Sequence, residues 1–338
     1  MKKVVAIASI LICVASTWKA SLWPSHFPKP LYQREIKEAT AAKILLGRTL
    51  FYDPLLSADN TISCASCHSP YNAFAHTDHK LSHGIRDSMG TRNAPALFNL
   101  AWQPKLTWDG ASHHLDMQAL APITHPGEMA ESMENILKKL VSSNTYPPLF
   151  QDAYGKDSIT SQRILKALTQ FQLTLVSSNA KYDRVKLNKD TFTSQEVLGY
   201  KLYQDNCRSC HAEPLFSMYS FKNNGLAPDT NNYDVGRYNV TNDQKDSFLF
   251  KIPSLRNLSY TYPYMHDGRF RKLREVLNHY TSTTLSKNNN LSDELKNGIS
   301  LTSNDKADLI AFLLTLDDKA FIFNTDNNFP RVTLLPQE

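Results

Sequence analysis

Two short runs of this 338-residue sequence contain residue types that could hold an iron-containing cofactor. Each run has two cysteines separated by two residues and followed directly by a histidine. This spacing is typical of covalent c-type haem attachment, in which both thiols bond to the porphyrin and the histidine binds the iron. The residues are Cys64, Cys67 and His68 in the first run and Cys207, Cys210 and His211 in the second. We therefore expect two covalently bound haem c groups.

Two other uses of cysteine pairs fit the sequence less well. The pairs of a structural zinc site are usually roughly 15 to 20 residues apart. Here about 140 residues separate Cys67 from Cys207. A thioredoxin-like redox pair needs a βαβ context, whereas the flanking segments are typical of helices and polar loops. The fifth cysteine, Cys13, lies in a segment that we expect to be removed, which leaves no thiol for a disulfide.

The N-terminus is typical of a secretory signal peptide. Lys2 and Lys3 precede an apolar run from Val4 to Val14, and this pattern marks residues 1–20 as a segment removed on export. The run is shorter than the roughly 20 apolar residues that cross a membrane. Because bacteria attach c-type haem outside the cytoplasmic membrane, we expect a periplasmic protein.

The net charge and the length of the mature chain bear on its partners and on its number of domains. Loss of residues 1–20 removes three lysines and lowers the formal net charge from +5 to +2. Nucleic-acid binding would require clustered Lys and Arg, so we expect no nucleic-acid partner. The mature length of roughly 318 residues suits two domains.

The segments around the two haem motifs match each other. Leu46-Gly47 and Leu198-Gly199 stand in helix-like runs before the motifs, and the second run begins with a capping box, Thr193 and Glu196. Later in each half, Leu168, Phe171, Thr174 and Leu175 match Leu309, Phe312, Thr315 and Leu316. Between these segments, Arg92-Asn93 matches Arg256-Asn257, and Trp108-Asp109-Gly110 matches His266-Asp267-Gly268. We therefore expect an all-α fold of two tandem cytochrome c-like haem domains related by internal duplication.

The matched segments set the domain boundaries. They predict an N-terminal haem domain over residues 38–178 and a C-terminal haem domain over residues 190–318. The tail, residues 319–338, contains Phe321, Ile322 and Phe323. We expect it to pack on one of the two haem domains, and the sequence does not say which.

Several motifs together resemble the bacterial di-haem cytochrome c peroxidase/MauG family. They are Leu46-Gly47 through Phe51-x-Asp53-Pro54-x-x-Ser57, Ser63 to His68, Arg92-Asn93-Ala94-Pro95, Trp108-Asp109-Gly110, Glu128-Met129, Pro253-x-Leu255-Arg256-Asn257 and Pro263-Tyr264-Met265-His266-Asp267-Gly268. The resemblance covers nearly the whole mature chain. It implies that the haem bound by His68 reacts with peroxide and that the haem bound by His211 takes in or shares electrons.

The resemblance also implies residues on the peroxide side of the first haem. His83, which is followed by Gly84, matches a removable iron ligand, and the alternative is a water or an open site. Glu128 matches the acid/base glutamate of the family, a role that needs a carboxyl group close to the peroxide. Gln118 matches a second residue on that side.

Two further sites follow from the resemblance. Trp108 matches a tryptophan between the two haems, where an indole can relay electrons, although most buried tryptophans are core residues. Asn93, with the backbone carbonyls of Thr261 and Pro263, matches a calcium site, and hard oxygen ligands suit that ion.

The position of Tyr280 is occupied by different residue types in the two branches of the family. At this position the peroxidase branch has a methionine that binds the C-terminal haem iron, whereas MauG has a tyrosine. Residues 273–280 are typical of a helix with Tyr280 on its apolar face and His279 rotated away from it. Simple core packing of Tyr280 is the alternative, in which case His279 or Met218 becomes the next candidate ligand.

The sequence leaves three functions to compare. The first is a periplasmic peroxidase that reduces hydrogen peroxide to water with electrons from a small cytochrome c or copper protein, relayed from the C-terminal to the N-terminal haem. The second is a MauG-like oxidase that modifies tryptophan residues of a partner protein through a high-valent haem state. The third, an electron carrier, does not explain Glu128 or His83. Whether the chain forms a homodimer is left open.

Overall fold

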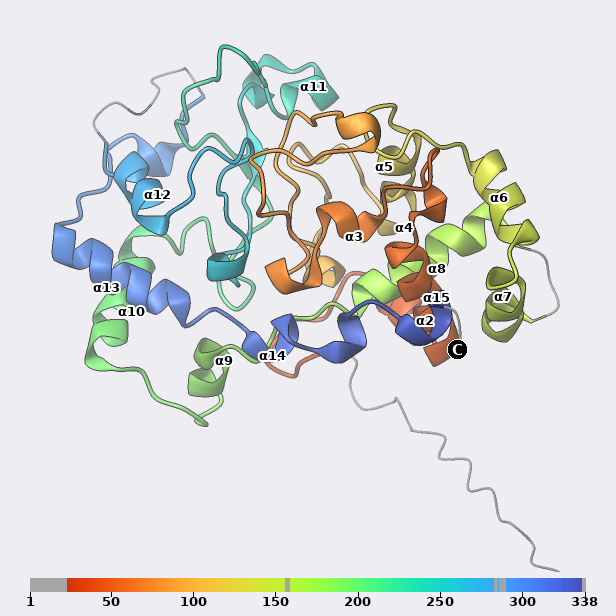
Figure 1. Cartoon of the computed structure of the whole chain (residues 1–338). Coiled ribbons are helices and arrows are strands. Elements are labelled where there is room, and N and C mark those ends of the chain that lie inside the picture. Colours follow the sequence, from red (N-terminus) through yellow and green to blue (C-terminus); the bar gives the residue numbers. More distant parts are fainter. Residues whose placement is uncertain (1–22, 156–158, 283–284, 286–289, 336–338) are drawn as a thin grey trace, which may run out of the picture.

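The computed structural model describes residues 23–155, 159–282, 285 and 290–335 and is rich in helices (Figure 1). Its single described sheet has two antiparallel strands, β1 (Phe221–Lys222) and β2 (Phe250–Lys251), with Phe221 opposite Lys251 and Lys222 opposite Phe250. The expected helical class is therefore confirmed, apart from this small sheet, which the sequence did not predict. None of the described helices is long and apolar enough to cross a membrane.

The N-terminal half is built from short and medium helices around a long pair. Its α-helices are α1 (Gln33–Glu38), α2 (Ala41–Tyr52), α3 (Cys64–Cys67), α4 (Leu115–Gln118), α5 (Leu120–Thr124), α6 (Met133–Ser142), α7 (Tyr146–Tyr154) and α8 (Ser161–Leu173). The α2 helix begins where the side chain of Thr40 accepts a hydrogen bond from the backbone N–H of Lys43, which satisfies one of the free donors at a helix start.

The C-terminal half and the tail contain seven described α-helices. They are α9 (Lys181–Lys186), α10 (Ser194–Asn206), α11 (Tyr238–Thr241), α12 (Leu273–Tyr280), α13 (Ser303–Leu314), α14 (Lys319–Ile322) and α15 (Arg331–Leu334). The predicted capping box is confirmed at the start of α10, because Thr193 accepts from the N–H of Glu196 and Glu196 accepts from the N–H of Thr193.

One helix pair in each half crosses at a glycine. The α2 helix packs on α8, and α10 packs on α13; the two pairs lie at opposite ends of the molecule (Figure 1). A Cβ atom on Gly47 would overlap the carbonyl oxygen of Ala167, and one on Gly199 would overlap the carbonyl oxygen of Asp308. Both glycines are therefore required by close contact between helix backbones.

The backbone corrects one of the matches proposed from the sequence. Asn99 and Asn257 both have left-handed φ angles, 55° and 60°, and both precede a short 3-10 helix, Leu100–Trp102 and Leu258–Tyr260. Asn257 therefore corresponds to Asn99, and matching Arg92-Asn93 with Arg256-Asn257 was wrong. The dipeptide was misleading because the feature that the two segments share is a left-handed turn residue, a conformation that asparagine tolerates well.

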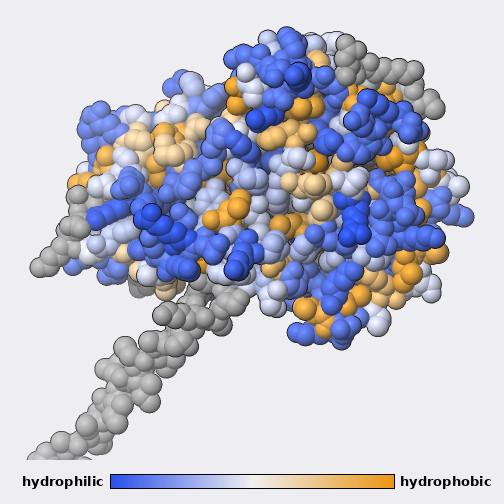
Figure 2. Space-filling model, turned by 180° about the vertical axis from the view of Figure 1, so that it is seen from behind, coloured by the Kyte–Doolittle hydropathy of each residue, from blue (hydrophilic) through white to orange (hydrophobic). Residues whose placement is uncertain are grey.

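The described residues form two hydrophobic cores. The larger includes Leu46, Leu50, Phe51, Phe74 and Phe171, and the smaller includes Tyr203, Phe216, Leu309, Phe312 and Leu316. The face of the molecule shown in Figure 2 is largely polar, with apolar patches between the polar side chains.

The tail runs from the C-terminal half to the N-terminal half (Figure 1). Phe321 and Ile322 belong to the larger core, and the ring of Phe321 lies 6.0 Å from that of Phe74. Farther along, the hydroxyl of Tyr52 donates to the carbonyl oxygen of Asn327 at 2.6 Å. The tail thus packs against the half that contains the first haem motif.

Candidate functional site

The first haem motif forms a short helix that ends at its histidine. Ser63 and Ser66 make a capping box around α3, and His68 follows the last turn. The Nδ1 atom of His68 hydrogen-bonds the carbonyl oxygen of Phe74 at 2.9 Å, and burial lowers the pKa of His68 to about 4. The imidazole is therefore neutral with Nδ1 engaged, which leaves Nε2 free to bind a metal.

The second motif has the same arrangement. His211 follows Cys207 and Cys210, and its Nδ1 atom lies 3.0 Å from the carbonyl oxygen of Pro253 and 3.3 Å from that of Phe216. Burial lowers the pKa of His211 to about 4 as well. Both histidines are thus oriented by backbone carbonyls from segments that follow the motif.

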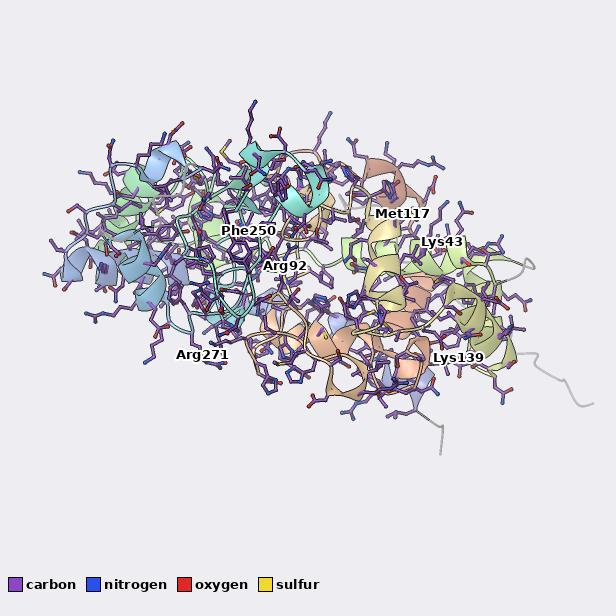
Figure 3. The ribbon with its side chains drawn as sticks, turned by 90° about the horizontal axis from the view of Figure 1, so that it is seen from above. Lys43, Arg92, Met117, Lys139, Phe250 and Arg271 are labelled. Atoms are coloured by element: carbon purple, nitrogen blue, oxygen red, sulfur yellow. The ribbon has the colours of Figure 1, made fainter. Side chains whose placement is uncertain are left out.

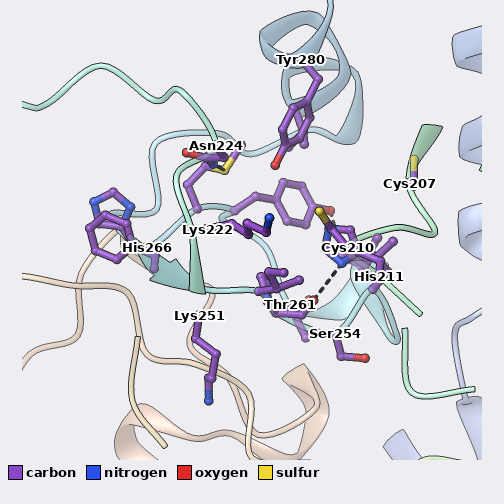
Figure 4. A pocket seen from close by; sticks show the side chains of 18 of the residues that line it. Cys207, Cys210, His211, Lys222, Asn224, Lys251, Ser254, Thr261, His266 and Tyr280 are labelled. Carbon is purple, nitrogen blue, oxygen red and sulfur yellow. Dashed lines mark hydrogen bonds between the residues drawn. The ribbon is translucent and has the colours of Figure 1, made fainter. Parts of the chain in front are cut away.

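A cavity of about 260 Å³ lies beside the second motif (Figure 4). Cys207, Cys210 and His211 line one part of it, and apolar side chains such as Leu255, Leu277 and Leu313 line much of the rest. A largely apolar chamber with two thiols and an oriented imidazole fits a covalently attached haem.

Tyr280 lines the same cavity from the end of α12. Figure 4 shows its side chain directed from α12 into the cavity. Burial raises the pKa of Tyr280 to about 12, although a hydrogen bond with the side chain of Asn224 opposes the shift. His279 instead hydrogen-bonds the carbonyl oxygen of Asn224 at 3.0 Å, and Met218 is 55% exposed. Of the three candidate ligands, Tyr280 is the one that faces the cavity.

Trp108 lines the cavity where the two halves meet. Its indole Nε1 donates to the carbonyl oxygen of Asn93 at 2.8 Å, and its own carbonyl oxygen accepts from the N–H of Lys251 at 2.7 Å. The N–H of Asn93 in turn donates to the carbonyl oxygen of His266 at 2.7 Å. Backbone contacts to both halves therefore fix the indole.

The residues of the predicted calcium site also lie along this cavity. Asn93, Thr261 and Pro263 all line it, and the side-chain amide of Asn93 donates to the carbonyl oxygen of Lys80 at 3.0 Å. Within the described part of the chain, no group of three or more His, Cys, Asp or Glu side chains is placed to hold a metal ion. Calcium binding stays a prediction that depends on amide and carbonyl oxygens.

His83 and Glu128 meet beside the first motif. The N–H of Ile85 donates to the carbonyl oxygen of Glu128 at 2.8 Å, and a Cβ atom on Gly84 would overlap the backbone of Gly127. The carbonyl oxygen of His83 lies 3.7 Å from the Sγ atom of Cys67. Gly84 is therefore needed for the His83 loop to pack against the Glu128 loop.

The side chains of these residues are partly exposed. Nδ1 of His83 lies 2.5 Å from an oxygen of Asp87, and its ring stacks on that of His79 at 4.6 Å. Burial raises the pKa of Glu128, opposed by His125, whose Nδ1 lies 3.9 Å from the carboxylate. Gln118 is the last residue of α4 and is also partly exposed.

Sequence reasoning missed the charged residues between the halves. Arg92 pairs with Asp109 at 2.5 Å and with both oxygens of Asp234 at 2.5 and 2.9 Å. Figure 3 shows Arg92 beside Phe250 in the middle of the molecule. Lys251 is buried, and burial lowers its pKa to about 7. Arg92 and Asp109 stand in motifs that the sequence analysis named, but neither was given a role. Asp234 lies in a polar loop that contains no recognisable motif.

Comparison with known proteins identifies the family of this chain. Residues 41–191 match the family described as di-haem cytochrome c peroxidase. The methylamine utilization protein MauG of Methylophilus methylotrophus is 35% identical over 94% of this chain and 96% of its own length. The chain belongs to the di-haem cytochrome c peroxidase family. Membership makes it an oxidoreductase and implies two haem c groups.

The family includes both kinds of enzyme considered from the sequence. The cytochrome c551 peroxidase of Nitrosomonas europaea is 36% identical over 69% of this chain and 70% of its own length. The crystal structure of a MauG-like protein associated with microbial copper homeostasis has a TM-score of 0.82 and 30% identity, and covers 94% of this chain and 99% of that one.

Proposed function

We propose that the chain is a peroxide-dependent oxidase of the MauG type, which oxidises tryptophan residues of a partner protein. The observation that carries the proposal is the position of Tyr280 at the cavity of the second haem motif. A methionine ligand raises the potential of a haem, whereas a phenolate is a hard anionic donor that favours higher oxidation states. The full-length similarity to MauG supports the same branch. We therefore favour the second of the two enzyme functions considered from the sequence.

The residues of the chain have separate tasks in this proposal. When bound, the two haems supply the iron chemistry that reduces peroxide and retains its oxidising power. His68 and His211 hold the irons, because the Nδ1 atom of each is already engaged by a backbone carbonyl. Glu128 moves the protons of the peroxide; burial raises its pKa, which favours transfer of a proton from the carboxyl group back to the peroxide. Trp108 relays electrons between the two sites.

The remaining predictions complete the proposal. Calcium binds through Asn93, Thr261 and Pro263 and ties the two halves together. Residues 1–20 direct the protein to the periplasm, where haem is attached; these residues lie outside the described part of the structure. Residues 38–178 and 190–318 are two haem domains that arose by duplication, as the paired glycine contacts and the paired turns at Asn99 and Asn257 support.

A second candidate is a cytochrome c peroxidase that reduces hydrogen peroxide to water with electrons from a small cytochrome c or copper protein. His83 favours it, because a removable ligand belongs to the peroxidase branch. The carbonyl of His83 contacts Cys67, and its loop packs on the Glu128 loop, so the residue is close to the first motif.

An anaerobic redox titration followed by addition of peroxide separates the two candidates. We expect slow oxidation of a reduced cytochrome c and a long-lived oxidised state of the haems. Rapid, repeated turnover of peroxide with the reduced cytochrome would instead establish the peroxidase.

Replacing Tyr280 by Phe tests the observation on which the proposal depends. We expect a changed ferric spectrum and a higher potential of the C-terminal haem, because an anionic ligand is lost. Tyr264→Phe is the matched control, since Tyr264 also lines the cavity but donates its hydroxyl to the carbonyl oxygen of Leu258 at 2.8 Å. If Tyr280→Phe leaves both the spectrum and the potential unchanged, Tyr280 is not a ligand.

A further inference from the structure

Two tyrosines lead from the second haem motif to the surface. Tyr203 is fully buried four residues before Cys207 on α10, and its hydroxyl donates to the carbonyl oxygen of His211. Tyr200 lies one helical turn earlier and is partly exposed. The two rings are stacked, with centroids 6.1 Å apart and planes 13° apart. The pair forms a continuous aromatic path from the haem-binding segment to solvent.

The hydrogen bonds of Tyr200 suit a residue that gives up an electron. Its hydroxyl donates to an oxygen of Glu213 at 2.8 Å and accepts from Nζ of Lys186 at 2.7 Å. A phenol is oxidised readily when its proton can move to a nearby acceptor, and a carboxylate is such an acceptor. Tyr203 faces a backbone carbonyl, which cannot take a proton. Of the two stacked tyrosines, Tyr200 is therefore the one whose proton has an acceptor. Tyr182 donates to the same oxygen of Glu213 at 2.6 Å but is buried, so Tyr200 is the phenol that a partner at the surface can reach.

The N-terminal half has no such path at the corresponding positions. Gly47 and Gly199 make the same contact with their partner helices, so Phe51 corresponds to Tyr203 and Arg48 to Tyr200. Phenylalanine is much harder to oxidise than tyrosine. Arg48 is also covered by the tail, because its Nε donates to the carbonyl oxygen of Asn328 at 2.7 Å. The two tyrosines thus distinguish the half that is expected to exchange electrons from the half that is expected to react with peroxide.

We propose that Tyr203 and Tyr200 relay electrons between the C-terminal haem and a redox partner protein at the surface, with Tyr200 as the exit. The inference rests on the proposed reaction with peroxide, which supplies the oxidant. Tyr200 loses one electron toward the oxidised haem site, and its proton moves along the hydrogen bond to Glu213. The partner then returns one electron to Tyr200 and the proton returns from Glu213. Reduction of one peroxide to two water molecules takes two electrons, so each peroxide drives this cycle twice.

The test is to locate the radical in the di-haem protein without a partner. Stoichiometric hydrogen peroxide is added, one sample is frozen rapidly for EPR spectroscopy, and another is treated with a nitrone spin trap and digested with trypsin. Cleavage after Lys189 and Lys201 releases residues 190–201, in which Tyr200 is the one tyrosine and no tryptophan occurs. We expect a tyrosyl EPR signal and a trap adduct on this peptide, and the loss of both in Tyr200→Phe.

Tyr52→Phe is the matched control, because Tyr52 is buried next to Phe51 and donates to a backbone carbonyl instead of a carboxylate. It should keep both the signal and the adduct. If peroxide changes the haem spectrum but the wild-type adduct is absent from residues 190–201, the relay is wrong and the proposed function stands. If peroxide leaves the haem spectrum of the wild type unchanged, the proposed function fails and the relay fails with it.

Discussion

The histidine of each haem motif already has the protonation state and the orientation that iron binding needs. His68 and His211 each direct Nδ1 to a backbone carbonyl, and burial lowers the pKa of both to about 4. A neutral imidazole with a fixed ring orientation is the form that binds metal. The motif predicted these ligands from spacing alone, whereas the carbonyls that orient them come from Phe74 and Pro253, which no motif indicates.

Glu128→Gln should slow the reaction with peroxide by roughly 10²-fold or more, the scale of a lost acid/base group. The two haem spectra should be nearly unchanged, because the amide keeps the size of the carboxyl group. Stopped-flow absorbance after mixing with peroxide measures the rate. Glu134→Gln is the control, since Glu134 is an exposed residue of α6 that pairs with Lys138. Equal rates for wild type and Glu128→Gln would remove Glu128 from the mechanism.

The pH dependence of the same reaction has a defined sign. Burial raises the pKa of Glu128 above its ordinary value of 4.5. In the proposed mechanism the carboxylate accepts the first proton of the peroxide, so the rate should fall as the pH is lowered through this raised pKa. Glu128→Gln has no group to protonate there, and its slower rate should stay flat over that interval. A wild-type acid limb that persists unchanged in the variant would assign the titration to another group.

The elements that carry the haem motifs were largely predictable from the sequence. The runs around Gly47 and Gly199 are helices, and the Thr193 capping box is present, because helical periodicity and capping are local signals. The strands β1 and β2 were missed, since two-residue strands lack an alternating pattern long enough to recognise. Asn257 was matched with Asn93 instead of Asn99, because a left-handed φ angle is a backbone property that a matching Arg-Asn dipeptide does not indicate.

Gly199→Ala should destabilise the contact between α10 and α13. The added Cβ would overlap the carbonyl oxygen of Asp308, and overpacking of this kind typically costs about 1–3 kcal/mol. Urea unfolding of the holoprotein, followed by circular dichroism, measures the free energy of unfolding. Gln204→Ala is the control on the same helix, because Gln204 is exposed, and it should change the stability by less than about 0.5 kcal/mol. A Gly199→Ala protein as stable as this control would contradict the tight crossing.

The whole molecule depends on contacts that join residues far apart in the sequence. Arg92 and Asp234, which are 142 positions apart, form a two-point ion pair between the halves. The wall of the haem cavity likewise combines Asn93 and Trp108 with residues from Cys207 to Leu313. Sequence patterns predict the two motifs and their helices. The ion pair and the cavity wall depend on how the two halves pack, and local sequence patterns do not predict that packing.

The assembled protein should carry two haems. Each motif presents two thiols and an oriented imidazole, so both sites can attach the cofactor covalently. Intact mass spectrometry of the denatured, purified protein should show two haem additions, and haem staining should persist on a denaturing gel. Cys207→Ala with Cys210→Ala should reduce the count to one. A single haem in the wild type would refute the assignment of one motif.

The tail should stabilise the half that contains the first haem motif. Phe321 is buried in the larger core, 6.0 Å from Phe74 and 6.1 Å from Phe98 between ring centroids. Replacing a buried Phe by Ala typically costs about 3–5 kcal/mol, because a cavity remains where the ring was. Phe321→Ala should therefore lower the free energy of unfolding by about that amount.

Phe323→Ala is the matched control for this prediction, since Phe323 is two residues away in the same tail and is 58% exposed. Its loss should change stability by less than about 0.5 kcal/mol. Urea unfolding of both holoproteins, followed by haem absorbance and circular dichroism, gives the two values. Because Phe321 contacts the segment whose carbonyl orients His68, Phe321→Ala should also perturb the spectrum of the first haem. Equal stabilities for the two variants would show that the tail does not support the N-terminal core.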